Sequence, residues 1–222
     1  MSTLFGDDLL GRPRRELAPG ATWVPGWLTL QQQAWIAARF REWAEGPVPP
    51  RAAKVRGREM SVRTVCLGWH WSPYRYTREA VDANGRRVLP MPDWLVRMGR
   101  AALMEVTGDP HAGDGYTPDA ALVNSYDENA RMGMHQDKDE HSLAPVVSVS
   151  IGDTCRFRFG NPETRNRPYQ DVELASGDLF VFGGPSRLAY HGVVAVRPGT
   201  APDGCGLATG RINITLRVTG LG

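Results

Sequence analysis

The second half of the chain limits most strongly what the protein can fold into. From about residue 119 to residue 219, short stretches of strand-forming residues alternate with Gly, Pro and Asn. These punctuating residues favour turns, so the pattern predicts about eight short strands. The predicted strands are 119–126, 131–137, 145–151, 155–160, 170–174, 178–182, 189–195 and 211–218. So many short strands in about a hundred residues favour a jelly roll or a sandwich over a βαβ arrangement.

The first half of the chain predicts two helices and a loosely ordered start. Residues 1–20 show little periodicity, which suggests an arm. Apolar residues at helical spacing predict one helix at 30–44 and a second at 92–106. Between them, Asn84-Gly85 is a turn signal that suggests a hairpin. We therefore expect a mainly β (α+β) protein with one catalytic domain and an N-terminal extension.

The last predicted strand, 211–218, alternates strictly between polar and apolar residues. Successive side chains point to opposite faces of a strand, so the polar ones share a face, and these are Arg211, Asn213, Thr215 and Arg217. On a typical edge strand such a face lies against solvent. The alternative is a cavity for an anion, since the paired donors of a guanidinium match the geometry of a carboxylate.

Two histidines and one acid have the spacing of metal ligands. His135 and Asp137 point the same way if they lie on a strand, and His191 lies in another predicted strand. Two imidazoles and a carboxylate form the facial triad of non-haem iron oxygenases, which leaves the opposite coordination positions for a chelating co-substrate and O₂. Such a set can also hold zinc for hydrolysis. The two arginines of the last strand favour iron, because a zinc hydrolase needs no clamp for a dicarboxylate.

The net charge of +2 conceals a basic segment. Residues 51–100 contain eleven Lys and Arg against four Asp and Glu, an excess of +7. This excess is either a solvated face or a footprint for phosphates. The segment also contains four closely spaced aromatic residues, which are Trp69, Trp71, Tyr74 and Tyr76. Aromatic clusters usually belong to a core, but an enzyme that acts on a nucleic-acid base must extrude the base and hold it against flat side chains.

Cysteine usage and hydropathy suggest a cytoplasmic protein without membrane association. Cys66, Cys155 and Cys205 are odd in number and far apart, which suits reduced thiols. The N-terminus has no hydrophobic signal segment, and no apolar run approaches the roughly 20 residues that span a bilayer. Because no apolar repeat requires a partner chain, we expect a monomer.

Four motifs resemble those of the AlkB family of oxidative DNA dealkylases. They are Asn124-Ser125-Tyr126, His135-Gln136-Asp137-Lys138-Asp139-Glu140, Ser186-Arg187-Leu188-Ala189-Tyr190-His191-Gly192, and the spaced Arg211, Asn213, Thr215 and Arg217. The resemblance extends from about residue 60 to the end of the chain, and more weakly to the N-terminus. It implies a double-stranded β-helix (jelly-roll) core at 92–222, a nucleotide-recognition lid at 51–91, and an arm with a support helix at 1–50.

The resemblance also implies roles for individual residues. The iron ligands and catalytic centre are His135, Asp137 and His191, with Arg217 beside them. The co-substrate 2-oxoglutarate is held at its distal carboxylate by Arg211 and Tyr126 and near the metal by Asn124, Asn213 and Arg217, and Thr215 shares their strand face. For the substrate, Trp69 stacks on the flipped base, Tyr74 and Tyr76 contact it, Asp139 contacts its exocyclic group, and Arg165 contacts DNA.

The implied reaction removes alkyl groups from bases such as 1-methyladenine and 3-methylcytosine. It uses Fe(II), 2-oxoglutarate and O₂ and releases formaldehyde, succinate and CO₂. A positively charged base suits a pocket that contains an acid and aromatic faces. The rival hypotheses are the same chemistry on RNA, on a protein or on a small molecule, and a metal-binding jelly roll without catalysis. The two arginines of the last strand speak against the non-catalytic module, which needs no co-substrate clamp.

Overall fold

A computed structural model describes residues 11–222, and its elements follow the predicted order closely. The helices are α1 (Leu30–Ala44) and α2 (Asp93–Thr107), with a short 3₁₀ turn η2 (Gly184–Ser186). The strands are β1 (Arg15–Ala18), β2 (Ala21–Val24), β3 (Arg51–Val55), β4 (Arg58–Leu67), β5 (His70–Ser72), β6 (Arg75–Thr77), β7 (Ala120–Tyr126), β8 (Met132–His135), β9 (Val146–Gly152), β10 (Cys155–Phe159), β11 (Gln170–Leu174), β12 (Leu179–Phe182), β13 (His191–Val196) and β14 (Arg211–Arg217). Both predicted helices and every predicted strand of the second half are confirmed to within a few residues.

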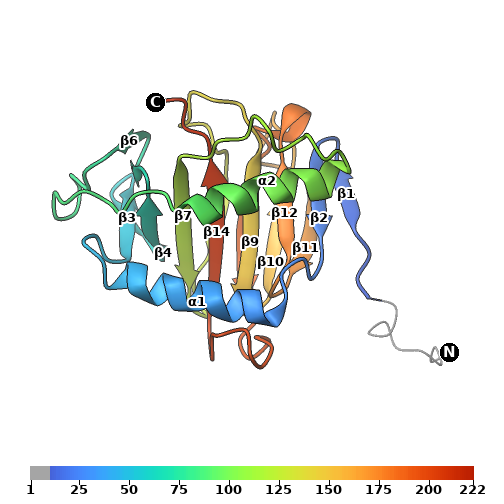
Figure 1. Cartoon of the computed structure of the whole chain (residues 1–222), viewed down its shortest axis with the longest axis horizontal. Helices are drawn as coiled ribbons and strands as arrows, with labels where there is room; N and C mark the ends of the chain where they lie inside the picture. The colour runs from blue at the N-terminus through green and yellow to red at the C-terminus, as the bar shows by residue number, and fades with distance from the viewer. Residues whose placement is uncertain (1–10) are drawn as a thin grey trace.

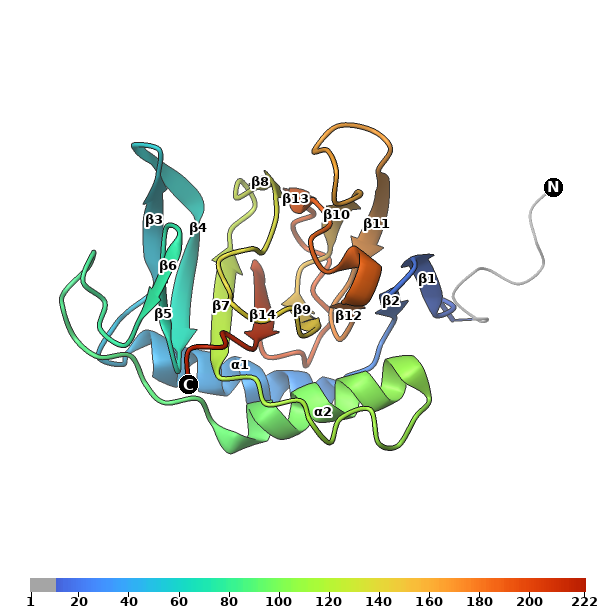
Figure 2. The ribbon, with the colours of Figure 1, turned by 90° about the horizontal axis from the view of Figure 1, so that it is seen from above.

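All strands except β5 and β6 form two facing antiparallel sheets, and the helices cover one of them. An 8-stranded sheet has the order β1-β2-β12-β9-β14-β7-β4-β3, and a 4-stranded sheet has the order β11-β10-β13-β8. Figure 1 shows α1 and α2 lying across the large sheet, and Figure 2 shows the small sheet on the side away from the helices. This arrangement confirms the predicted jelly-roll core with flanking helices. Residues of both sheets, such as Arg211 of β14 and His191 of β13, line one cavity between them.

Local sequence signals begin and end the two helices. Thr29 caps α1: its side chain accepts from the backbone of Gln32, whose own side chain accepts from the Thr29 backbone. This capping box satisfies two otherwise unpaired backbone donors. Helix α2 ends at Gly108, whose φ of 72° is the left-handed conformation that glycine adopts without strain. Both helices then bury apolar side chains, such as Ile36 and Leu95, against the outer face of the large sheet.

Strand β14 lies in the middle of the large sheet, between β9 and β7. Its apolar side chains Ile212, Ile214 and Leu216 therefore pack under the helices. Its polar face is also buried, with exposed fractions of 3% for Arg211, 8% for Asn213, 7% for Thr215 and 7% for Arg217. The solvent-exposed interpretation of this alternation is therefore wrong. Both faces are covered because β14 is a central strand, which alternation within a single strand cannot reveal.

The N-terminal part is more ordered than its sequence predicts. Arg15–Ala18, within the expected arm, forms β1, which pairs with β2 at one edge of the large sheet. Residues 1–10 of the expected arm lie outside the described part of the chain. At the opposite edge, β4 pairs with β7, so strands on both sides of the predicted boundary at residue 92 share one sheet.

The two-stranded β5–β6 hairpin lies beside β4, over the edge of the core (Figure 2). Asn84-Gly85 lies farther along this region, in a turn where Gly85 has a φ of 71°. The turn prediction is therefore confirmed. The predicted hairpin is reduced to one isolated antiparallel bridge between Glu79 and Arg87.

Candidate metal centre and substrate cavity

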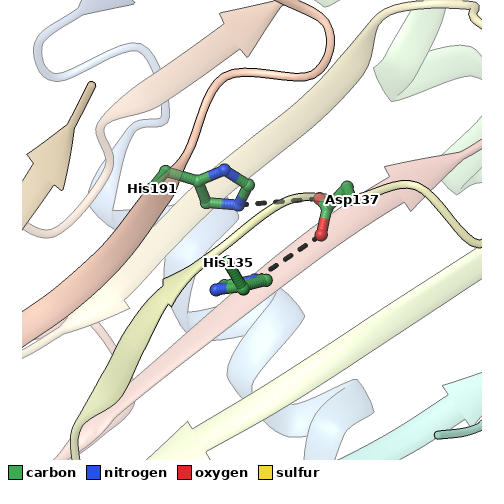
Figure 3. Close-up of side chains that lie close together, drawn as sticks. All are labelled: His135, Asp137 and His191. Atoms are coloured by element: carbon green, nitrogen blue, oxygen red, sulfur yellow. Dashed lines mark ion pairs between the residues drawn. The ribbon is translucent and has the colours of Figure 1, made fainter. Parts of the chain in front are cut away.

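The three predicted metal ligands converge between the sheets. His135 ends β8 and His191 begins β13, and the two are direct partners across the β8–β13 ladder. Asp137 follows two residues after His135 and points at both imidazole rings (Figure 3). One potential ligand atom from each of the three residues lies within 4.8 Å of the others. The register of β8 on β13 is therefore what brings together ligands that are 56 residues apart in the sequence.

Hydrogen bonds fix which nitrogen of each imidazole faces the centre. The Nδ1 atoms of His135 and His191 lie 2.9 Å from the Gly133 carbonyl and 3.0 Å from the Ala189 carbonyl. A carbonyl only accepts, so Nδ1 carries the proton and Nε2 keeps its lone pair for a metal. The Nε2 atom of His135 lies 3.5 Å from Asp137 Oδ1, and that of His191 lies 3.7 Å from Oδ2.

Protonation states at the triad suit a divalent cation. Burial raises the pKa of Asp137, but Arg217 and the histidines outweigh this effect and hold the pKa well below its usual range. Burial lowers the pKa of His191 to about 4, so its imidazole is neutral at pH 7. Asp137 Oδ2 is buried and forms no hydrogen bond with residues 11–222. A buried carboxylate oxygen without a partner beside two free imidazole nitrogens fits the 2-His-1-carboxylate set that binds Fe(II).

The polar face of β14 and the adjacent face of β7 form a slot beside the triad. Arg211 is the cross-strand partner of Tyr126, and Asn213 is the partner of Asn124. The predicted co-substrate residues line one cavity together with all three metal ligands, and they are Asn124, Tyr126, Arg211, Asn213, Thr215 and Arg217. The structure thus brings the whole predicted co-substrate set next to the metal ligands.

Arg211 has the unsatisfied donors that an anionic ligand would pair. Its Nη2 donates to Ser150 Oγ at 2.8 Å, while Nε and Nη1 are buried without a partner among the described residues. Its guanidinium carbon lies 5.2 Å from the centre of the Tyr126 ring. An unpaired buried charge is strongly unfavourable, so this arrangement fits a carboxylate that completes the hydrogen bonds when it binds. The slot is therefore suited to 2-oxoglutarate.

Arg217 links the slot to the metal ligands through a buried charge network. Its Nη2 lies 2.8 Å from Asp137 Oδ1, and its Nη1 donates to Glu140 Oε1 at 2.9 Å. The other oxygen of Glu140, Oε2, accepts from Arg187 Nη2 at 3.0 Å. Arg187 also donates from Nη1 to the backbone carbonyl of Asp137 at 2.5 Å. Two acids and two arginines thus balance their charges in the interior, and they hold the Asp137 segment in place.

Sequence reasoning did not identify Glu140 and Arg187 as members of this network. Both lie inside the motifs that were recognised, and a charged residue in an otherwise buried segment is the signal that could have indicated them. Sequence reasoning also missed Ser150, which accepts from Arg211, and Ser148, which accepts from Asn213. The two serines alternate with apolar residues in β9, and this alternation is the signal that could have indicated them.

A second cavity, of about 400 Å³, adjoins the triad on the side of the β5–β6 hairpin. Of the predicted substrate residues, Tyr74, Asp139 and Arg165 line it, together with His135 and Asp137. Tyr76 does not: it is 8% exposed, and its hydroxyl donates to Glu140 Oε1 at 2.5 Å.

Trp71 lines this cavity in place of the predicted Trp69. The indole of Trp69 donates to Asp119 Oδ2 at 2.9 Å, away from the cavity, and Arg78 covers its ring at 3.6 Å. Gly68, with a φ of 75°, separates β4 from β5 just before the two tryptophans. The stacking role of Trp69 was inferred from the resemblance to the AlkB motif at Leu67-Gly68-Trp69, and in this structure it is Trp71 that lines the cavity.

Comparisons with known proteins agree with this geometry. Residues 20–217 match the model of the 2OG-Fe(II) oxygenase superfamily. The chain is 38% identical to an alpha-ketoglutarate-dependent dioxygenase AlkB homolog of Caulobacter vibrioides, over 90% of this chain and 88% of that one. It is 32% identical to the DNA N(6)-methyladenine demethylase ALKBH1D of Arabidopsis thaliana, over 90% of this chain and 50% of that one.

A solved structure, that of OsALKBH1, superimposes with a TM-score of 0.81 at 32% identity. The alignment covers 92% of this chain and 100% of that one. The match in sequence extends over nearly the whole chain, and the fold, the triad and the carboxylate slot all agree with it. The chain therefore belongs to the AlkB family of Fe(II)- and 2-oxoglutarate-dependent dioxygenases.

Proposed function

We propose that this enzyme removes alkyl groups from N-alkylated bases in DNA, such as 1-methyladenine and 3-methylcytosine, and so repairs alkylation damage. The products would be the repaired base, formaldehyde, succinate and CO₂. The observation that carries the proposal is the cavity next to the triad. It is lined by aromatic side chains, by the acid Asp139 and by four cations, three of which form no ion pair within residues 11–222. Its volume of about 400 Å³ lies within the range of small-ligand sites, about 300–1,000 Å³.

The proposal assigns the residues of the triad to the metal and those of the adjacent slot to the co-substrate. His135, Asp137 and His191 would hold Fe(II), which would supply, with 2-oxoglutarate and O₂, the oxidative chemistry that removes the alkyl group. Arg211 and Tyr126 bind the distal carboxylate, and Asn124, Asn213 and Arg217 orient the end near the metal. Thr215 donates to Asn213 Oδ1 at 3.1 Å and so fixes that amide. The contribution of the protein is to position the reactants and shield them from water.

The base would lie between aromatic faces and beside Asp139. Trp71 and Tyr74 line the cavity, and Tyr74 is 61% exposed at its mouth. An acid and aromatic rings attract a base that alkylation has made cationic, through charge and cation–π contact. Alkylation also abolishes base pairing, which makes extrusion of the base from the duplex easier. We assign the stacking role to Trp71, and we assign Trp69 and Tyr76 to the support of the lid.

Three cations at the cavity would bind the phosphates on either side of the extruded base. Arg56, Lys138 and Arg165 come from three separate segments of the chain and all line the cavity. None of them forms an ion pair within residues 11–222. Cations that form no ion pair within the protein are available to replace the counterions of a nucleic-acid backbone. This feature favours nucleic acid over a small hydrophobic substrate or a protein side chain.

DNA is the proposed partner because one of the matched relatives is named as a DNA demethylase. RNA remains the alternative partner, since the same cavity and cations suit either backbone. We further propose a monomer, since one chain provides every residue of the site. We propose a cytoplasmic location because all three cysteines are free and buried. No helix within residues 11–222 has the length and apolarity needed to cross a membrane.

The proposal is tested with a panel of oligonucleotides incubated with Fe(II), with and without 2-oxoglutarate. The panel contains 1-methyladenine, 3-methylcytosine, N(6)-methyladenine or no modification, each in DNA and in RNA. Formaldehyde release that depends on 2-oxoglutarate and on a methylated DNA base is the expected result. Formaldehyde release from the RNA oligonucleotides alone would show that the enzyme acts on RNA and not on DNA. No release from any oligonucleotide, from a protein that still consumes 2-oxoglutarate, would contradict the proposed substrate class.

A further inference from the structure

The lid hairpin is attached to the metal-ligand segment by one pair of facing residues. Trp71 on β5 and Tyr76 on β6 are direct cross-strand partners. Trp71 Nε1 donates to Asp139 Oδ2 at 2.8 Å, and Tyr76 Oη donates to Glu140 Oε1 at 2.5 Å. Their acceptors are consecutive residues, two and three positions after the metal ligand Asp137. A single rung of the hairpin is thus hydrogen-bonded to two adjacent acids.

The Tyr76 side of this attachment is fixed. Glu140 is 8% exposed, and its carboxylate also accepts from Arg217 and Arg187. Hydrogen bonds to buried charged groups are stronger than those between neutral groups. The hydrogen bond from Tyr76 therefore fixes the position of the hairpin relative to the segment that follows Asp137. Trp71 is the cross-strand partner of Tyr76, so its position is fixed as well.

The Trp71 side differs, because its acceptor is only half-satisfied. Asp139 lines the cavity, and one of its oxygens, Oδ2, accepts the indole N–H. The other oxygen, Oδ1, forms no hydrogen bond or ion pair with any part of the chain that the structure describes. An ionised carboxylate can accept up to about four hydrogen bonds. Asp139 is therefore oriented by Trp71 and has one oxygen left to accept from a ligand.

We propose that Trp71 is a specificity-determining residue that acts by positioning Asp139. The inference rests on the proposed function of the cavity. The indole N–H holds the carboxylate so that Oδ1 accepts from an exocyclic amino group of the base. 3-Methylcytosine presents such a group and a positive charge. 3-Methylthymine has the same shape, but it is neutral and has a carbonyl oxygen at that position, which an oriented carboxylate repels.

The test compares the affinities of the metal-free protein for two oligonucleotides, which separates recognition from catalysis. They differ only in carrying 3-methylcytosine or 3-methylthymine, and the readout is the ratio of the two Kd values by fluorescence anisotropy. The wild type is expected to prefer 3-methylcytosine. Trp71→Phe keeps a flat ring but removes the N–H, and we expect it to reduce the preference by about tenfold, the effect of one hydrogen bond to a charged group. Trp69→Phe is the matched control, because its N–H bonds Asp119 instead, and it should keep the ratio of the wild type.

A double-mutant cycle separates positioning from stacking. Phenylalanine also forms a weaker cation–π contact than tryptophan, which would by itself disfavour the cationic base. If Trp71 acts through Asp139, the ratio for Trp71→Phe combined with Asp139→Asn equals that for Asp139→Asn alone. A Trp71→Phe effect that persists unchanged in the Asp139→Asn background would overturn the inference, as would an equal effect of Trp69→Phe. If the wild type does not distinguish methylated from unmethylated oligonucleotides, it is the proposed function that fails.

Discussion

Arg217 Nη2 lies 2.8 Å from Asp137 Oδ1, so the arginine assigned to the co-substrate also contacts a metal ligand. The same guanidinium donates to Glu140 at 2.9 Å and to Tyr76 Oη at 3.1 Å. Metal ligand, co-substrate slot and lid therefore meet at one side chain. A change at Arg217 should affect all three, whereas a change elsewhere in the slot should affect one.

Replacing Arg217 by lysine should weaken co-substrate binding although the charge is kept. Lysine cannot reproduce the planar fork that contacts Asp137 and Glu140 together. One lost hydrogen bond between charged groups corresponds to about 1.5–3 kcal/mol, so the KM for 2-oxoglutarate should rise at least about tenfold. Uncoupled consumption of 2-oxoglutarate measures this directly. Arg86→Lys, at an exposed position of the lid, is the control. An unchanged KM for Arg217→Lys would show that Arg217 does not serve the co-substrate.

Replacing Arg211 by methionine should weaken the binding of 2-oxoglutarate without lowering the stability of the ligand-free protein. The buried Nε and Nη1 of Arg211 have no partner among the described residues, so the ligand-free variant should be at least as stable as the wild type. It should, however, lose the stabilisation given by 2-oxoglutarate with Mn(II), about 2.7 kcal/mol at a hundredfold excess over Kd. Thermal unfolding with and without the ligands tests both statements. A ligand-induced rise in Tm equal to that of the wild type would rule out Arg211 as the anion site.

The two lid tyrosines should differ in their effect on stability. Tyr76→Phe removes a buried hydrogen bond to the Glu140 carboxylate and should reduce the free energy of unfolding by about 1.5–3 kcal/mol. Tyr74→Phe changes a side chain that is 61% exposed, and its effect should stay within about 0.5 kcal/mol. Urea unfolding of both variants is the measurement. Equal effects would show that the hydroxyl of Tyr76 does not anchor the hairpin.

His70 should make the stability of the protein depend on pH. Its side chain is 1% exposed, and burial lowers its pKa, although the hydrogen bond with Asp82 acts in the opposite direction. The unfolded chain then binds the proton more readily than the folded one, so stability is full above the unfolded pKa of about 6.5 and decreases as the pH falls below it.

The contribution of His70 is isolated by substitution. Urea midpoints between pH 7.5 and pH 5 should decline less for His70→Gln than for the wild type, since glutamine does not titrate in this range. His111→Gln changes a side chain that is 80% exposed. The urea midpoint of this variant should decline with falling pH as that of the wild type does. Parallel declines for all three proteins would mean that His70 does not cause the pH dependence.

Sequence reasoning was most successful where the signal is local. Periodicity and turn residues within a few positions predicted the strand limits in the second half and the helix at 30–44. They also predicted that the polar side chains of β14 share one face. The ligand triad also followed, since the two-residue spacing of His135 and Asp137 and a recognised motif around His191 sufficed. What the sequence could not reveal depends on sheet order. The burial of the β14 polar face follows from its place between β9 and β7, which residues 211–218 do not encode alone.

The lid shows the same limit at the level of single residues. Trp69 and Trp71 are the same type of residue two positions apart. Their long-range hydrogen bonds distinguish them, because Trp69 donates to Asp119 and Trp71 donates to Asp139 at the cavity. Tyr76 resembles a substrate contact by its position in the motif, yet its facing partner on β5 and the buried Glu140 give its hydroxyl another role. Contacts between distant segments therefore decided each assignment that local reasoning missed.

The proposed iron site is tested by the formation of a complex in which the protein binds Fe(II) and 2-oxoglutarate together. Under anaerobic conditions the wild type should give a weak visible charge-transfer band when both are added. His135→Ala should abolish the band, while His141→Ala, at an exposed position outside the triad, should keep it. A band of full intensity in His135→Ala, or none in the wild type, would contradict the assignment of the iron site.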